Sequence, residues 1–244
     1  MILQEAINVQ YFGILRIMFP IFMCVFIFFS AIPLSKYLQT KSKVALYFAI
    51  TNLIFTVLFV VMELGILDAM DAGVKTYLYY FSLLFMNIGI IAASIFYYLF
   101  YALIVESPKK ERRLIIIEGI SVIVFQLVIW PNWFGPSAGG MQPKYIAWLL
   151  QTIFCVYIYI RMAREFLKLA NKVKEREREL RAMGIGSVLI FVFFVFMLLR
   201  VLVMGTDILN LIVQILSWVI FLSSTISFFY GFILPNLIND NKGE

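Results

Sequence analysis

Charged residues within or beside long apolar segments are the ones best placed to do chemistry in this 244-residue chain. Ionisable side chains inside a membrane are costly and by default face the interior of a helix bundle. Counted along the apolar segments given below, Arg16, Glu63 and Arg200 fall at one depth near the outer ends of three helices, and Asp207 lies just beyond. A ligand cavity open to the outside, with Glu63 as counter-ion and the arginines as anion donors, fits this pattern.

Three interpretations of these charges remain open: a ligand pocket, a structural ion-pair cluster with arginines reaching the interface, or a proton- or ion-coupling site. Uncharged polar residues deeper in the segments most often hydrogen-bond between helices; they are Asn52, Asn87, Gln126, Gln151 and Gln214. Gln151 and Gln214 lie in the outer third and could line the same cavity. The predicted ligand-binding residues are therefore Arg16, Glu63, Gln151, Arg200 and Gln214.

The composition indicates that helices in a membrane position these residues. The chain is 63% hydrophobic and only 14% charged, whereas a soluble domain of this size needs a polar surface. A spanning helix needs about 20 mostly apolar residues. Seven segments qualify: 11–33, 44–67, 76–104, 113–131, 144–166, 183–204 and 208–234. We predict an all-α polytopic membrane protein, a single seven-helix domain over residues 1–244.

The distribution of basic residues predicts the orientation. Loops one, three and five and the C-terminal tail carry 16 of the 20 Lys/Arg residues, whereas the opposite side has only Lys75 and Lys144. Because cationic loops stay on the cytoplasmic side, we expect the N-terminus outside, the C-terminus in the cytoplasm, and a multi-pass location in the plasma (inner) membrane. The net charge of +6 is thereby explained by the lipid bilayer as partner, without nucleic acid.

Sequence signatures of catalysis are missing. The chain has no histidine, no Gly-rich phosphate loop and no G-x-S-x-G motif. Cys24 and Cys155 both lie in apolar runs, which argues against a disulfide framework. A retinal protein would need a lysine in the last helix, and residues 208–239 contain none. We therefore predict no enzymatic activity, no cofactor and no metal site.

The fifth loop, residues 161–183, is the largest segment expected outside the lipid on the cytoplasmic side. It contains eight Lys/Arg and four Glu residues, with Glu177–Arg181 and Glu175–Arg178 spaced for helical ion pairs. We expect a protruding helical hairpin that turns near Asn171. An apolar stripe at helical spacing follows it: Met162, Phe166, Leu169, Val173, Leu180 and Met183.

Three roles for this basic hairpin, residues 161–183, remain open. It could be a solvated anchor that sets the orientation, or a contact for anionic lipids. It could also dock a cytoplasmic signalling protein through its stripe, at Phe166, Leu169, Val173 and Leu180.

The loop sequence ERERELRAMGIG (175–186) and the last span ending FFYGFILPNLI (228–238) resemble the seven-transmembrane sensor domains of prokaryotic histidine kinases and related membrane signalling proteins. The resemblance extends over all seven segments, although its motifs are short. It implies ligand sensing in the outer half of the bundle and relay of the signal to the cytoplasm. Only nine residues follow Pro235, with no phosphoacceptor histidine. The resemblance therefore implies a sensor that works through a separate partner, or a chain that continues into an output domain.

Two other classes share this layout. A transporter or channel could arrange seven spans as two repeats around a linker helix, and SIFYYLF (94–100) is faintly similar to TISFFYG (225–231). A receptor resembling the eukaryotic G-protein-coupled class has the same topology, but both cysteines lie within spans and the acidic-Arg-aromatic motif is missing from the third. We expect a sensor for a small molecule or ion, with the transporter as the alternative.

Overall fold

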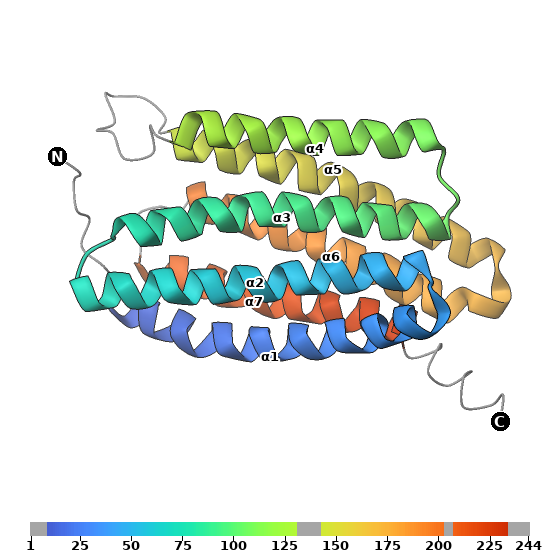
Figure 1. Cartoon of the computed structure of the whole chain (residues 1–244), viewed down its shortest axis with the longest axis horizontal. Helices are drawn as coiled ribbons and strands as arrows, with labels where there is room; N and C mark the ends of the chain where they lie inside the picture. The colour runs from blue at the N-terminus through green and yellow to red at the C-terminus, as the bar shows by residue number, and fades with distance from the viewer. Residues whose placement is uncertain (1–8, 131–142, 203–206, 234–244) are drawn as a thin grey trace. The chain divides into compact units, whose positions relative to one another are not determined.

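The computed structural model describes residues 9–130, 143–202 and 207–233, and these residues are helical apart from short connections (Figure 1). The all-α prediction is confirmed. The α-helices run Val9–Thr40 (α1), Lys43–Ala72 (α2), Tyr77–Ile104 (α3), Lys109–Ile129 (α4), Pro143–Lys172 (α5), Glu177–Leu202 (α6) and Asp207–Phe228 (α7). A 3₁₀ turn, Lys174–Arg176 (η2), precedes α6, and a π-helical turn, Phe229–Ile233 (η3), follows α7.

Six of these helices are long and apolar enough to cross a membrane, which is typical of a multi-pass membrane protein. The exception is α4, because it begins with the charged segment Lys109–Arg113 and also contains Glu118. The apolar part that remains is shorter than the roughly 20 residues that a span needs.

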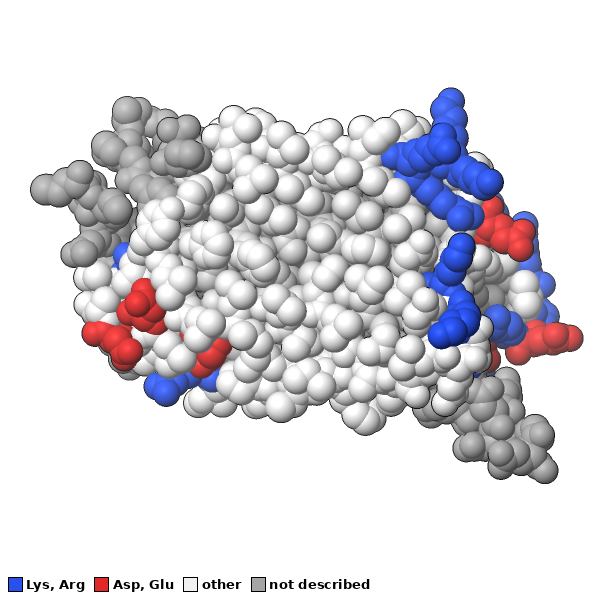
Figure 2. Space-filling model, viewed as in Figure 1, with Lys and Arg blue, Asp and Glu red and all other residues white. Residues whose placement is uncertain are grey.

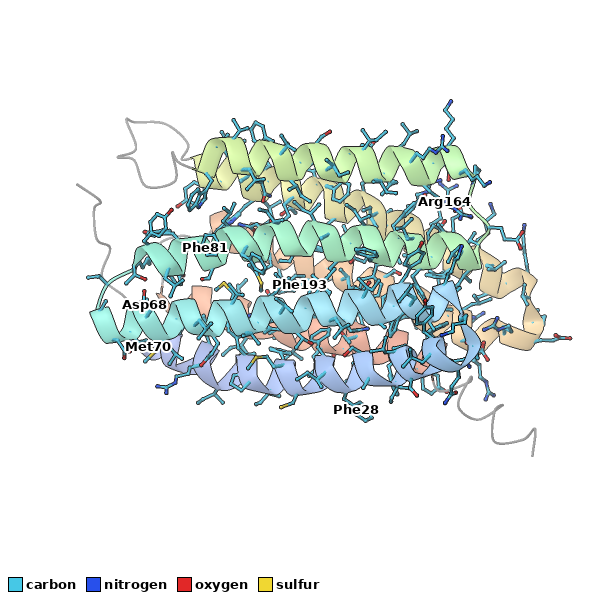
Figure 3. The ribbon with its side chains drawn as sticks, viewed as in Figure 1. Phe28, Asp68, Met70, Phe81, Arg164 and Phe193 are labelled. Atoms are coloured by element: carbon cyan, nitrogen blue, oxygen red, sulfur yellow. The ribbon has the colours of Figure 1, made fainter. Side chains whose placement is uncertain are left out.

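Large apolar side chains lie exposed along the middle of the helices, where a soluble protein would carry polar ones. Val57 is 49% exposed and Ile120 is 51% exposed. Phe28 projects outward from α1 (Figure 3). A lipid environment would cover such surfaces, because lipid tails are as apolar as these side chains.

The helices extend beyond several of the predicted spans. α1 continues from the predicted end at residue 33 to Thr40, and α5 continues from 166 to Lys172. Hydropathy detects only the apolar part of a helix, whereas backbone hydrogen bonding continues into charged sequence. The predicted loop at 131–143 and the tail after Pro235 fall almost entirely outside the described residues.

The packing of the chain divides into two compact units, which we describe separately. Unit 1 comprises residues 1–100 and 109–151, and unit 2 comprises residues 101–108 and 152–244. In unit 1, aromatic rings join α1 to α2: the ring centroids of Phe19 and Phe22 each lie 5.4 Å from that of Phe59. Phe48 of α2 contacts Tyr97 of α3 in the same way, at 6.0 Å.

Charges in unit 1 gather at the ends of its helices. Basic residues lie where α1 meets α2, with Lys41 and Lys43, and in the first turn of α4, while Asp68 and Asp71 lie at the far end of α2. Between these ends the face seen in Figure 2 is a broad band of uncharged residues. This is the charge pattern of helices whose middle lies in lipid.

In unit 2, α5, α6 and α7 share an aromatic core. Tyr159 of α5 lies 6.0 Å from Phe194 of α6 between ring centroids, and Phe193 lies 5.0 Å from Phe221 of α7. The end of α3 belongs to the same unit, because Tyr101 contacts Phe166 of α5 at 5.3 Å. The basic hairpin is the junction of α5 and α6 and thus continues directly from this core.

Candidate functional site

Arg16 and Glu63 come together in unit 1, as their depth in the sequence predicts. Phe19 of α1 packs against Phe59 of α2, and Arg16 and Glu63 each lie one helical turn from this contact, on the same side of it. Arg16 lies close enough to act electrostatically on the Glu63 carboxylate. The Arg16 side chain is exposed, whereas Glu63 is half-buried.

One carboxylate oxygen of Glu63, Oε2, is buried and has no hydrogen-bond partner among the described residues. A buried carboxylate oxygen that lacks a partner loses its hydration without replacement, which costs several kcal/mol in an apolar medium. Such an atom in a folded protein calls for an explanation, and a bound ion, water or ligand is one. Arg16 and Glu63 can therefore supply one positive and one negative group to a small molecule.

Gln151, the third predicted site residue, lies on α5 and is 5% exposed. Its oxygen Oε1 is also buried without a partner in the described part of the chain. On the neighbouring helix α4, the Gln126 side-chain amide donates to the backbone carbonyl of Ala147, one turn before Gln151 on α5, at 3.4 Å. Gln126 thus contacts α5 one helical turn from Gln151, within unit 1.

Arg200 and Gln214 complete the predicted set and belong to unit 2, on α6 and α7. Their side chains lie outside the described residues. The five predicted residues are therefore divided between the two units, and only Arg16, Glu63 and Gln151 have a described environment. The ligand-binding role of all five stays a prediction.

Sequence reasoning passed over Asn87 and Gln126 as members of a site. Both are expected to hydrogen-bond between helices, and Gln126 does so through its side-chain nitrogen. Asn87 Nδ2 and Gln126 Oε1 are nevertheless buried without partners in the described structure. Counting from the helix ends does not place them at one depth, because Asn87 follows the start of α3 by about three turns whereas Gln126 precedes the end of α4 by only one.

The basic hairpin turns two residues later than expected. α5 continues through Asn171 to Lys172, because the Val173 amide still donates to the Leu169 carbonyl at 2.9 Å. The chain leaves helical geometry at Val173 and enters α6 through η2.

The apolar stripe of the hairpin is mostly covered by the chain itself. Phe166 is fully buried and Leu180 is 3% exposed. Leu169 is half-buried and Val173 is exposed. A buried side chain is not available to a partner, so the docking prediction narrows to Leu169 and Val173. The buried residues of the stripe belong to the core of unit 2.

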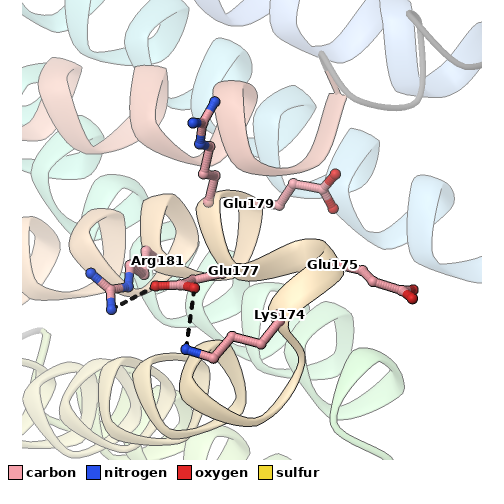
Figure 4. Close-up of a pocket in the computed structure, with 6 residues that line it drawn as sticks. Lys174, Glu175, Glu177, Glu179 and Arg181 are labelled. Atoms are coloured by element: carbon pink, nitrogen blue, oxygen red, sulfur yellow. Dashed lines mark ion pairs between the residues drawn. The ribbon is translucent and has the colours of Figure 1, made fainter.

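Basic and acidic side chains of the hairpin form ion pairs with one another. The predicted pair of Glu177 with Arg181 is confirmed at 2.7 Å, and Glu177 also contacts Lys174 at 3.7 Å (Figure 4). Arg176 pairs with Glu179 at 2.7 Å. A hollow of about 620 Å³ between these side chains is lined by three basic and three acidic residues. It therefore carries no net charge that would select an anion or a cation.

The last turn of the described chain packs directly on the first turn of α6. A β-carbon on Gly231 of η3 would lie 2.6 Å from the Glu179 carbonyl oxygen and 2.8 Å from the Met183 side chain. Only glycine allows this approach of one backbone to another. π-Helical turns are rare and often occur at functional sites. The hairpin and the end of the last helix are thus in mechanical contact within unit 2.

Comparison of the chain with protein-family models, with curated proteins and with solved structures finds no match. Function must therefore be argued from the residues. Among the residues that the structure describes, no three His, Cys, Asp or Glu side chains come together as a metal site would require.

Proposed function

We propose that this protein is a membrane sensor of the plasma (inner) membrane that binds a small molecule or ion in the outer half of its helix bundle and relays binding to a cytoplasmic partner. All seven α-helices would span the bilayer, with the N-terminus outside and the C-terminus inside. For α4, whose apolar part is short, the charged first turn Lys109–Arg113 would lie at the cytoplasmic surface. The excess of basic residues on the three connections α1–α2, α3–α4 and α5–α6 supports this orientation. The resemblance to prokaryotic seven-helix sensor domains agrees with it.

The observation that carries the proposal is the state of Glu63. A carboxylate within a membrane-length helix has one buried oxygen without a partner and a guanidinium nearby. A purely structural ion pair would gain most by satisfying that oxygen within the protein. The unsatisfied carboxylate oxygen favours a ligand with a hydrogen-bond donor or a positive group.

The relay would run through unit 2. Gly231 of η3 contacts the backbone of Glu179, in the hairpin, and Gly184 of α6 contacts Leu167 of α5. Because both glycines allow close packing of these elements, a shift of α6 would displace the hairpin and the end of the last helix together. The hairpin would then present the change at the membrane surface.

The proposal is tested by thermal unfolding of the purified protein in detergent with a panel of small anions, amino acids, amines and lipids. A ligand of the folded state raises the midpoint, by about 2.7 kcal/mol of stability at a hundredfold excess over its Kd. We expect a compound that shifts wild type but not Glu63→Gln. Asp71→Asn is the control, because it removes a carboxylate from the exposed end of the same helix.

Two outcomes would contradict the proposal. If no compound shifts wild type and Glu63→Gln only lowers its midpoint, Glu63 is a structural residue. If a compound binds and also crosses the membrane of liposomes that contain the protein, with Glu63→Gln abolishing the flux, the protein is a transporter and not a sensor.

A further inference from the structure

Three buried carboxamides lie on three neighbouring helices of unit 1. Asn87 of α3 is 7% exposed, Gln126 of α4 is fully buried, and Gln151 of α5 is 5% exposed. Each has a buried polar atom without a hydrogen-bond partner in the described structure: Asn87 Nδ2, Gln126 Oε1 and Gln151 Oε1.

The packing next to these residues places them at one level. Leu84 of α3 and Ala147 of α5 form a buried cluster, against which Ile129 of α4 packs. Asn87 lies three residues after Leu84, Gln126 three before Ile129, and Gln151 four after Ala147. Since α4 runs opposite to α3 and α5, each of these steps leads in the same direction, by about 5 Å along the helix axis.

Helical periodicity also points the three side chains toward the same space. Residues three or four apart share a helix face, so each amide lies on the face that its helix presents to the cluster. On α4 this face is narrow, because its buried residues are Ile115, Gly119 and Gln126 alone among those described. The bond from Gln126 to the Ala147 carbonyl fixes this glutamine between α4 and α5.

The atoms left open define the chemistry of an occupant. Gln126 Oε1 and Gln151 Oε1 accept hydrogen bonds, and Asn87 Nδ2 donates one. The complement is a molecule that donates two hydrogen bonds and accepts one. An ion is disfavoured, because three uncharged amides do not repay the loss of its hydration. Leu84 and Ala147 are in contact one turn away, and for this reason we consider only an occupant of a few atoms.

We propose that Asn87, Gln126 and Gln151 form a binding site for one small hydroxyl compound, either a water molecule or a short diol. A water molecule has two donors and two acceptors and typically makes about three hydrogen bonds when buried. This binding site does not depend on the proposed function. Only its role as the uncharged part of a ligand pocket that includes Gln151 rests on the proposed function.

The test is magnetisation transfer from water to side-chain amides, by NMR of protein labelled with ¹⁵N-glutamine in lipid bilayers. Gln126→Met and Gln151→Met identify the two signals by their loss, and Gln126→Asn serves if a Met variant does not fold. Gln39→Met is the control, since it makes the same change at an exposed position. We expect transfer from water to both buried amides in wild type.

Ethylene glycol distinguishes the two occupants. If it reduces the transfer from water and raises the thermal midpoint of wild type but not of Gln126→Met, the occupant is a diol. If ethylene glycol changes neither the transfer from water nor the thermal midpoint, the occupant is water. If neither water nor ethylene glycol transfers magnetisation to the two buried amides, the site is overturned, because the three side chains would then bond to one another. Neither result depends on Glu63, so this site and the sensing role can fail independently.

Discussion

Gly231 approaches the first turn of α6 so closely that a β-carbon there would lie 2.6 Å from the carbonyl oxygen of Glu179. The contact joins the last described turn of the chain to the basic hairpin, 52 residues earlier in the sequence. Any motion of η3 must therefore be accommodated at the base of the hairpin. This relationship gives the proposed relay its route and makes it open to mutation.

Gly231→Ala should separate η3 from α6. The added methyl group meets backbone, which cannot rotate away, so we expect a loss of about 1–3 kcal/mol in the free energy of unfolding. Thermal or denaturant unfolding in detergent measures it. Gly13→Ala is the matched control, because a β-carbon there meets nothing within 4 Å. Equal effects of the two substitutions would show that the close contact is not formed.

Phe166→Ala should destabilise the protein by about 3–5 kcal/mol, because the ring is fully buried and packs on Tyr101. Val173→Ser, at the exposed tip of the same stripe, should change the unfolding free energy by less than about 0.5 kcal/mol. The same unfolding measurement reports both. A mild effect of Phe166→Ala would mean that this side chain is free to meet a partner.

The ion pair of Glu177 with Arg181 should contribute little to stability. Both side chains are partly exposed and lie four residues apart on a helix, for which about 0.3–0.5 kcal/mol is usual. Arg181→Ala should therefore shift the unfolding midpoint only slightly, and less in high salt. A large loss at Arg181 would instead indicate that the hairpin charges hold unit 2 together.

The orientation can be checked by labelling single cysteines in intact cells. In a variant with Cys24→Ala and Cys155→Ala, a cysteine at Asp71 should react with a membrane-impermeant thiol reagent from outside. A cysteine at Glu175 should react only after the cells are opened. Both parent residues are exposed, so burial does not confound the comparison. The reverse pattern would place the basic hairpin outside and refute the topology.

The helices themselves could be predicted from the sequence, because the apolar runs are separated by segments rich in charged residues, Gly or Pro. Their ends could not. Hydropathy ends the fifth span at 166, whereas the hydrogen bond from the Val173 amide to Leu169 carries α5 beyond it. The turn was expected at Asn171, a residue that favours turns, but helical continuity prevailed over this local preference.

The apolar stripe shows what periodicity can and cannot reveal. The spacing of Met162 and Phe166 correctly indicated one buried face of α5, and the sequence suggested a partner as its cover. The cover of Phe166 is Tyr101, at the end of α3, which lies more than 60 residues away along the chain. Contacts between distant segments follow from the packing of helices and cannot be counted from spacing within one of them.

The candidate site, like the helices, could be predicted from the sequence only in part. The shared depth of Arg16 and Glu63 followed from counting along two consecutive helices. The grouping of Asn87, Gln126 and Gln151 required the register of α3, α4 and α5, which the contacts of Leu84, Ala147 and Ile129 supply. Sequence reasoning identified these residues as polar but had no means of placing them at one level.

The central claim is that binding near Glu63 changes the basic hairpin, and electron paramagnetic resonance of a nitroxide on a cysteine at Glu175 tests it most directly. The label is placed in the variant without Cys24 and Cys155, and the compound is one that raises the thermal midpoint of wild type. We predict that the compound changes the mobility of the label in this protein and has no effect once Glu63→Gln is added. A compound that raises the midpoint while the spectrum of the label stays the same would contradict the claim.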